Sequence, residues 1–474
     1  MNTGDGRAWP APMALCVYAV LLLGASPLAA QEPAEEDAKR AQSSEQTSSS
    51  GETQQNDEQQ APEGGYPVER KRLVGGPTDV TTDLITSFPK PDSVLPSLIP
   101  GKWFTFKEKA YEKTGVKLSF SYQALYQNAS DTLGLLDADF VFSGYLVFEA
   151  KWNAYRRGED YQGSLTTIID WRTAMGGGAP SALYGPLGVG SLWATDVAFD
   201  DLGPTVPLFY WEQWFKKDVF VLRVGKQLAS QTYDFFRFKD PRSSFTASPF
   251  TLHNSIPHPP FGQGVSLEWW PNQGSELYLQ GTLNDMNGDP DRFGLDTFFQ
   301  DRQYFYGFEI GYFWKRNFPA DFDHIHLDVF YADEKAEPSV PGFPNEAGGG
   351  FKVLGSKQVG RLVGFGSYTF NTAEGGGFSL SFARHTVTGG LAVLKPAGIR
   401  GEVGVGLSWM DAFEDVTLPV IGDLRNQFGS EVYWKLLLMP DLWITPGVQF
   451  VWNPAFNPAA DFVAVPQLKF RLFF

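Results

Sequence analysis

The chain has 474 residues, of which 15% are aromatic and 19% are charged, and its formal net charge is −16 at pH 7. This acidic balance argues against a nucleic-acid partner, because proteins that bind phosphate backbones present basic surfaces. The 50 Gly and 33 Pro are typical of many short strands joined by turns rather than of helices. At this length the chain could form two or three soluble domains or one large closed sheet.

The first residues are typical of an export signal. We interpret residues 1–30 as a signal peptide, with Arg7 as its positive start, an apolar run at 15–23 and a cleavage point after Ala30. The apolar run is too short to span a bilayer. Cys16 is the single cysteine and lies within this signal, so we expect no disulfide and no thiol chemistry in the mature chain.

The next segment is polar. Residues 31–65 contain no Leu, Ile, Val or Phe and cannot bury enough apolar area to offset the entropy of ordering. Residues 66–100 are Pro-rich and irregular, so 31–100 is predicted to be a leader that is disordered at first and Pro-rich after residue 65. Residues 101–115 are predicted to form a short helix that ends at Gly115, near what would be the periplasmic mouth of a barrel.

From residue 116 onward the chain divides into sixteen strand-like segments, most of them alternating between apolar and polar residues and bounded by Gly, Pro, Asn or Asp. Bacterial single-chain transmembrane barrels alternate in this way and use even strand numbers. Segment 390–396 is the weakest, and without it the count would be odd. The predicted strands are 116–127, 142–152, 161–172, 207–216, 218–227, 263–270, 276–284, 304–314, 324–332, 360–370, 377–387, 390–396, 400–410, 427–438, 441–452 and 463–474.

Connection lengths alternate with strand parity. Transmembrane barrels have short periplasmic turns and longer outer loops, whereas a soluble β-sandwich has no reason to sort its connections in this manner. With both termini periplasmic, the long connections face outward. An exception is the sixth outer connection, between 387 and 390, which is nearly absent. The long connections after odd-numbered strands are 173–206, 228–262, 285–303, 333–359 and 411–426.

The two faces of single strands differ in polarity. In strand 324–332, Ile325, Leu327, Val329 and Tyr331 alternate with His324, His326, Asp328 and Phe330. In the last strand, Leu468, Phe470, Leu472 and Phe474 alternate with Gln467, Lys469 and Arg471.

One face would meet lipid and the other water, although the last strand could also be the edge of a soluble sheet. We therefore predict an all-β fold, a closed antiparallel transmembrane barrel of about sixteen strands over 116–474. It would lie in the lipid bilayer of a Gram-negative outer membrane. The final strand, which closes on Phe474, resembles the C-terminal signal that the barrel assembly machinery reads.

Several segments together resemble the carbohydrate-selective porin family, whose members are OprB-like. The likeness extends over residues 101–474, and the order and spacing of the segments carry it. The resemblance implies a sixteen-stranded outer-membrane barrel, usually monomeric, that passes monosaccharides such as glucose. This chain departs from the family in its polar leader and in its sixth outer connection. The segments are FYWEQWF (209–215), LRVGKQ (222–227), FGQGV (261–265), LNDMNG (283–288), EVYW (431–434) and PGVQFV (446–451).

Selectivity would reside in the residues that narrow the pore. In porins generally the third outer loop folds into the lumen, and here that loop is 228–262; a solvated surface loop is the alternative. Sugar recognition requires hydrogen-bonding groups for hydroxyls and a flat aromatic face for the ring, and the rigid fork of arginine suits the first task. The candidate pore-lining and sugar-binding residues are Asp170, Arg172, Glu212, Trp214, Arg223, Arg237, Glu268 and, on the opposite wall, Arg361.

Other functions remain open at this point. A general porin, or one for another solute, would have the same architecture. Residues 285–296 offer oxygen atoms at alternating positions, as a calcium loop does, but the glycine offset differs and no Glu closes the loop; a solvated loop is the default. His324, His326 and His385 with Asp328 could serve a barrel enzyme. We predict no catalysis, no cofactor and no metal.

Overall fold

The computed structural model describes residues 65–66, 80–90, 93–136, 139–216, 219–252, 255–272, 275–315, 323–338, 344–377, 381–413, 417–418 and 422–474. The predicted signal peptide and most of the predicted leader lie outside the described residues. Within the described ranges, no helix is long and apolar enough to cross a membrane.

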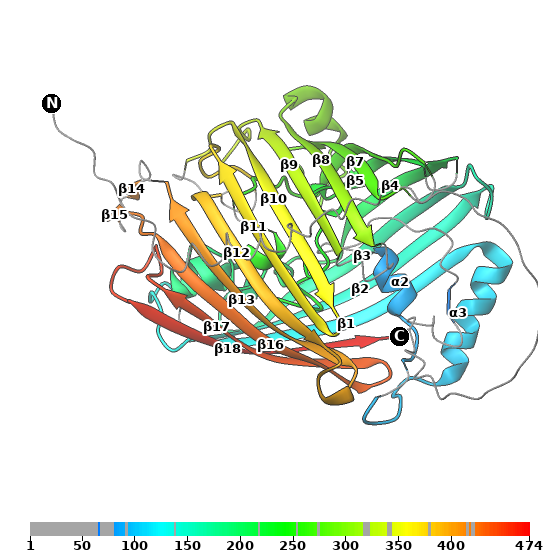
Figure 1. Cartoon of the computed structure of the whole chain (residues 1–474), viewed down its shortest axis with the longest axis horizontal. Helices are drawn as coiled ribbons and strands as arrows, with labels where there is room; N and C mark the ends of the chain where they lie inside the picture. The colour runs from blue at the N-terminus through cyan, green and yellow to red at the C-terminus, as the bar shows by residue number, and fades with distance from the viewer. Residues whose placement is uncertain are drawn as a thin grey trace, which may run out of the picture.

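Sixteen antiparallel strands close into one barrel (Figure 1), which confirms the predicted fold class. Each strand pairs with its neighbours in sequence, except that β13 pairs with β16 and β18 closes the ring on β1; β14 (Thr417–Leu418) and β15 (Gly422–Asp423) form a separate pair. The barrel strands are β1 (Val116–Asn128), β2 (Phe140–Tyr155), β3 (Gly163–Gly176), β4 (Thr205–Phe215), β5 (Phe220–Gln227), β6 (Gly262–Trp269), β7 (Leu277–Asp285), β8 (Tyr304–Lys315), β9 (Asp323–Ala332), β10 (Gly348–Val359), β11 (Leu362–Asn371), β12 (Ala383–Leu394), β13 (Gly401–Ala412), β16 (Gln427–Met439), β17 (Leu442–Trp452) and β18 (Phe462–Phe473).

The exterior of the barrel is apolar and the interior is polar. On β9, Leu327, Val329 and Tyr331 are 39, 48 and 47% exposed, whereas His326 and Asp328 are buried. A sheet with one lipid-facing and one inward face requires this period of two. The predicted alternation is therefore confirmed on this strand.

Two strands differ from the prediction. Residues 348–359 form β10, although the sequence suggested a long outer connection there, and β12 is one strand where two were predicted, at 377–387 and 390–396. β10 begins with three consecutive glycines, which have no side chains, so the alternation of apolar and polar residues is not visible at its start. Within β12, a Cβ on Gly390 would lie 2.5 Å from the Phe365 ring, so this glycine makes room for an aromatic side chain and is not a turn.

These two errors cancel in the strand count. The sixth outer connection, predicted to be nearly absent, is in fact residues 372–382, between β11 and β12. Long connections thus follow every odd-numbered strand of the ring, as expected. We call that end of the barrel the long-loop end and the opposite one the short-turn end.

The N-terminal part of the described chain lies at the short-turn end, beside the C-terminus (Figure 1). Residues 80–86, inside the span predicted to be Pro-rich and irregular, form helix α2 (Val80–Thr86), whose Val80 and Leu84 side chains are buried. Helix α3 (Gly101–Thr114) ends at Gly115, which adopts φ 76°, a conformation that glycine tolerates best. The remaining short helices are α4 (Ser181–Leu183), η1 (Tyr184–Val189), η2 (Ala229–Gln231), α5 (Ser248–Thr251), η3 (Thr297–Asp301) and η4 (Pro396–Gly398).

The strap between the two helices, described at residues 87–90 and 93–100, is attached to the β16–β17 turn. Lys90 N donates to Pro440 O at 3.0 Å, and Leu95 N donates to Leu438 O at 2.8 Å. The Asp441 carboxylate accepts hydrogen bonds from Leu98 N at 3.1 Å and from Ile99 N at 3.0 Å. The Lys107 ammonium of α3 completes this attachment, because it donates to the carbonyl of Ser87 at 2.8 Å.

Candidate pore constriction

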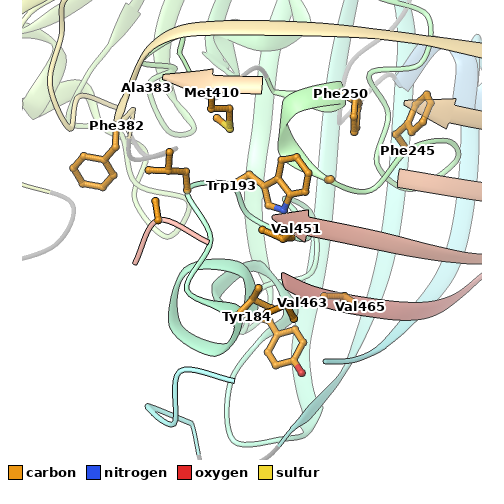
Figure 2. Close-up of a cluster of buried hydrophobic side chains, with 14 of the residues drawn as sticks. Tyr184, Trp193, Phe245, Phe250, Phe382, Ala383, Met410, Val451, Val463 and Val465 are labelled. Carbon is orange, nitrogen blue, oxygen red and sulfur yellow. The ribbon is translucent and has the colours of Figure 1, made fainter. Parts of the chain in front are cut away.

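The third outer loop, which we call L3 (residues 228–261), folds into the barrel and is not a solvated surface loop, the alternative that the sequence left open. Its Phe245 and Phe250 are fully buried and lie in one apolar cluster with inward residues of the wall (Figure 2). The Phe245 ring lies 4.7 Å from that of Tyr433 on β16 and 5.7 Å from that of Phe365 on β11. A Cβ on Gly406 of β13 would lie 2.7 Å from the Phe250 ring, so the wall is hollowed where the loop packs.

The second outer loop, L2 (residues 177–204), also enters the barrel, which was not predicted from the sequence. Its Trp193 and Tyr184 are fully buried in the same cluster (Figure 2). A Cβ on Gly429 of β16 would lie 1.7 Å from the Trp193 ring, so only glycine fits there. The apolar, small-residue run 181–193 was the available signal, because a solvated loop would be polar.

Ion pairs fix the start of L3 to the wall. Asp234 binds Lys239 at 3.0 Å and also pairs with Lys352 of β10. The backbone N–H of Asp234 donates to Glu309 of β8 at 2.6 Å. These charged groups are buried, and each has a partner of opposite charge or a hydrogen-bond donor, as burial requires.

Asp234, His326 and Asp328 are close enough together to hold a metal ion. However, Asp234 already pairs with two lysine ammonium groups, whose charges oppose a divalent cation. His326 lies 3.1 Å from Asp328, which makes the cluster a compensated ion-pair network. We assign it to anchoring L3.

The histidines do not form one catalytic group. His324 lies 3.0 Å from His326 and 3.1 Å from the Ser356 hydroxyl, on the inner face of the wall. His385 on β12 instead lies 2.9 Å from the Tyr368 hydroxyl, and its neighbour Thr386 is the residue that points inward. The sheet therefore separates His385 from the other two.

Four predicted site residues converge on one inward network. Arg223 of β5 binds Glu212 of β4 at 2.9 Å and Glu268 of β6 at 3.0 Å. The Trp214 indole N–H donates to Glu212 at 3.0 Å. Arg223 is 4% exposed and Glu212 is fully buried, so the guanidinium bridges the two carboxylates within the wall.

Two further members of this network were not predicted. Lys151 of β2 binds Glu212 at 2.6 Å, and the Trp270 indole N–H donates to Glu268 at 2.8 Å. Lys151 lies in the last third of β2 and Trp270 follows β6, both near the short turns. The aromatic belt of a barrel also lies at this level, so their residue types alone did not indicate an inward position.

Asp170 and Arg172 of β3 form a separate pair. Their side chains are 2.7 Å apart, and the Tyr145 hydroxyl donates to Asp170 at 3.0 Å. The Arg172 guanidinium lies over the rings of Tyr145, at 4.7 Å, and of Phe261, at 5.5 Å. Because Phe261 is the last residue of L3, this pair supports the C-terminal end of the loop.

The last two candidates lie in different surroundings. Arg237, in L3, is half-buried, and its Nε atom is buried without a hydrogen-bond partner among the described residues. Arg361 was predicted on a strand facing the pore, but it lies in the exposed β10–β11 turn, where its guanidinium is 3.4 Å from the Lys395 carbonyl. The overlooked strand β10 caused this error, because the prediction began the next strand at residue 360.

A third network joins distant parts of the chain. Asp83 of α2 binds Arg242 of L3 at 2.9 Å and Arg471 of β18 at 2.6 Å. Asp240 of L3 binds the same two arginines, at 2.9 and 3.2 Å. Although burial acts in the opposite direction, the two guanidinium groups hold the pKa of Asp240 well below its ordinary value. The helix α2 is thereby tied to the loop that fills the barrel.

The possible calcium loop at 285–296 is organised around a lysine. The Lys226 ammonium donates to the carbonyls of Pro290 at 2.7 Å and of Arg292 at 2.6 Å. The Asp285 carboxylate accepts a hydrogen bond from Asn287 N at 2.9 Å and another from Thr297. The loop oxygens thus already surround a cation of the protein itself.

Comparisons with known proteins define the fold. No protein-family profile and no curated protein matches the chain. The high-pH structure of Pseudomonas putida OprB is similar, with a TM-score of 0.63 and 12% identity over 81% of this chain and 100% of that chain. Its low-pH structure aligns with a TM-score of 0.44 and 10% identity over 79% and 98% of the two chains. A triple mutant of Rhodopseudomonas blastica porin aligns with a TM-score of 0.42 and 12% identity over 76% and 100%. The first of these likenesses shows that the chain has the fold of Pseudomonas putida OprB.

Proposed function

We propose that this chain is an outer-membrane channel of a Gram-negative bacterium through which carbohydrates, monosaccharides such as glucose, diffuse passively. The fold supports this proposal, because a closed barrel with an apolar exterior and a polar interior suits a bilayer-spanning pore. L3 and L2 narrow its interior. We infer no catalytic step.

One observation carries the preference for sugars. Arg223 lies between Glu212 and Glu268, and the indoles of Trp214 and Trp270 donate to these same carboxylates. The network lies on β4–β6. Phe235 of L3 lies in one apolar cluster with Trp270, and Phe245 of L3 packs on β11 and β16, on the other side of the ring. Fixed donors and acceptors beside flat aromatic faces are what a pyranose requires.

A second candidate function, a channel without solute preference, is favoured by the burial of the same network. Arg223 is 4% exposed and its guanidinium is occupied by two carboxylates. If those bonds persist during transport, the network holds the wall together and contributes nothing to affinity.

The variant Arg223→Lys separates these functions, because lysine keeps the charge but cannot form the two-sided bridge. A sugar site predicts that block of single-channel current by glucose weakens by about tenfold while ion conductance stays the same. Equal changes in both quantities would favour the unselective channel. Arg292→Lys is the matched control, because the Arg292 side chain is 72% exposed on an outer loop.

We also propose that the channel is monomeric and that Phe474 is the signal for the barrel assembly machinery. Phe474 N donates to Phe120 O at 2.9 Å, and the two rings are stacked at 5.8 Å, so the last residue seals the β18–β1 seam. Deleting Phe474 should reduce insertion in cells more than refolding in detergent. Equal losses in both assays would assign Phe474 a purely structural role.

A further inference from the structure

Three cations gather inside the short-turn end of the barrel. They are Lys90 of the strap, Arg237 of L3 and Lys435 of β16, and we call them the cationic cluster. Lys90 donates to the backbone carbonyls of Thr86 and, at 3.5 Å, Phe88. Among the residues that the structure describes, none of the three cluster members forms a salt bridge with a carboxylate.

Shared aromatic rings show that Lys90 and Lys435 converge. The ammonium groups of Lys90 and Lys435 lie over the same Trp443 ring, at 5.9 and 4.7 Å. Lys90 and Arg471 both lie over the Phe473 ring, at 4.9 and 4.4 Å. Trp443 and Arg471 are register partners on β17 and β18, so the rings form one inward platform.

The carboxylates near this cluster are already engaged. Glu402 accepts hydrogen bonds from the hydroxyls of Tyr433 at 2.9 Å and Ser244 at 3.0 Å. Asp240 is shared by Arg242 and Arg471. Both carboxylates lie near Lys435, as does the guanidinium of Arg237. The cluster therefore keeps a positive excess, and positive charges held together in a low dielectric repel one another unless an anion compensates them.

The cluster is less buried than the Arg223 network. Lys90, Arg237 and Lys435 are all partly exposed, in contrast to the buried Arg223 network. Arg237 also keeps a buried Nε–H group that has no hydrogen-bond acceptor among the described residues, which costs free energy until an acceptor arrives. Cations that are partly exposed and have no carboxylate partner favour binding of an anionic ligand.

We propose that Lys90, Arg237 and Lys435 bind the carboxylate or phosphate group of a small organic solute, of the sugar-acid or sugar-phosphate class, with the Trp443 ring beside its carbon skeleton. A planar guanidinium and two ammonium groups provide charge-assisted bonds to an oxyanion. The inference deepens the proposed function, on which it rests. At the cationic cluster, which is a second site beside the Arg223 network, the channel would bind anionic sugars in preference to neutral ones.

Direct binding tests the site without requiring a current. The full chain, refolded in detergent, is titrated by calorimetry with glucose 6-phosphate, glucuronate and glucose in turn. We expect each anion to bind about tenfold more tightly than glucose. Inorganic phosphate distinguishes the sources of affinity: if it binds as well as glucose 6-phosphate, the site recognises the oxyanion alone and the assignment to sugars is wrong.

Variants locate the site. Arg237→Gln and Lys435→Gln should each weaken binding of both anions by about tenfold and leave glucose unaffected, whereas Arg292→Gln on the outer loop should change nothing. Heat-modifiable migration on gels verifies that each variant folds. Equal affinity for glucose and its anionic derivatives, or unchanged affinity in both variants, would overturn the proposal. Anion binding in a chain that carries no current would support the site and contradict the channel.

Discussion

The Oδ2 atom of Asp83 lies 2.9 Å from the Nη1 atom of Arg242, and both side chains are buried. One residue belongs to helix α2 at the short-turn end and the other to the loop that enters from the long-loop end. This pair attaches the N-terminal segment to L3, the loop that folds into the barrel. Helix α2 and L3 are therefore each attached to an element that comes from the opposite end of the barrel.

Breaking this pair should loosen α2. Asp83→Asn leaves Arg242 and Arg471 with one anionic partner fewer, and loss of one member of a buried pair costs about 3 to 5 kcal/mol. We expect faster hydrogen exchange in residues 80–90, measured by mass spectrometry, while the barrel strands keep their protection. Glu112→Gln, exposed on α3, is the control. Unchanged exchange in the Asp83 variant would show that the strap alone holds α2.

Glycine at position 429 should be required for insertion of L2. A Cβ there would meet the Trp193 ring at 1.7 Å, and overpacking of this kind typically costs about 1 to 3 kcal/mol. Gly429→Ala should raise the single-channel conductance, because L2 is displaced from the lumen. Gly203→Ala, with no atom within 4 Å of the new Cβ, should leave the conductance unchanged. If both variants behave alike, L2 does not limit the pore.

L2 should also respond to pH through Asp196. Burial raises the pKa of Asp196 to about 6, although the N–H groups of Phe199 and Ala198 donate to its carboxylate. Because the pKa is higher in the folded loop than the ordinary 3.8, protonation of Asp196 stabilises the folded loop. This stabilisation is fully present below pH 3.8. It is lost as the pH rises through about 6, and amounts to about 3 kcal/mol.

The corresponding measurement is protection of L2 from hydrogen exchange at pH 4.5 and 7.5, corrected for the intrinsic rate. We expect lower protection at the higher pH in the natural chain and no pH difference in Asp196→Asn. Asp131→Asn, exposed in the first outer loop, should retain the pH dependence. A pH effect that survives in the Asp196 variant would assign it to another group.

Anion binding by the cationic cluster should strengthen on acidification. Burial, followed by repulsion from Lys435, Arg471 and Arg400, lowers the pKa of Lys90 to about 7. The Lys90 side chain is therefore mostly charged at pH 6 and mostly neutral at pH 8.5, and only the charged form attracts an oxyanion. Glucuronate, whose carboxylate stays ionised over this range, should bind more tightly at pH 6 by calorimetry. Lys90→Met should remove the difference, and a persistent difference would exclude Lys90 as its source.

The sequence predicts the barrel well because side-chain alternation in a sheet is a local property. Leu327 and Val329 face lipid simply because their neighbours His326 and Asp328 face inward. The alternation fails where glycine serves packing, as Gly390 does beneath Phe365. Because β10 was not predicted, Arg361 was placed on a strand that faces the pore, whereas it lies in the β10–β11 turn.

Contacts between distant segments were less predictable. Glu212, Arg223 and Glu268 lie on consecutive strands, so their convergence follows from strand order and parity. The bonds of Asp83 to Arg242 and Arg471 depend on how a leader segment and a loop meet inside the barrel. No local pattern encodes such a meeting, since short polar segments have no strong intrinsic structure.

The most direct test of the proposed function is single-channel current through the refolded mature chain in a planar bilayer, titrated with glucose. We predict a steady current that glucose blocks saturably, with the block weakened in Arg223→Lys. A current that no sugar blocks would contradict the carbohydrate assignment and leave an unselective porin. A properly inserted barrel that carries no current would contradict the channel itself.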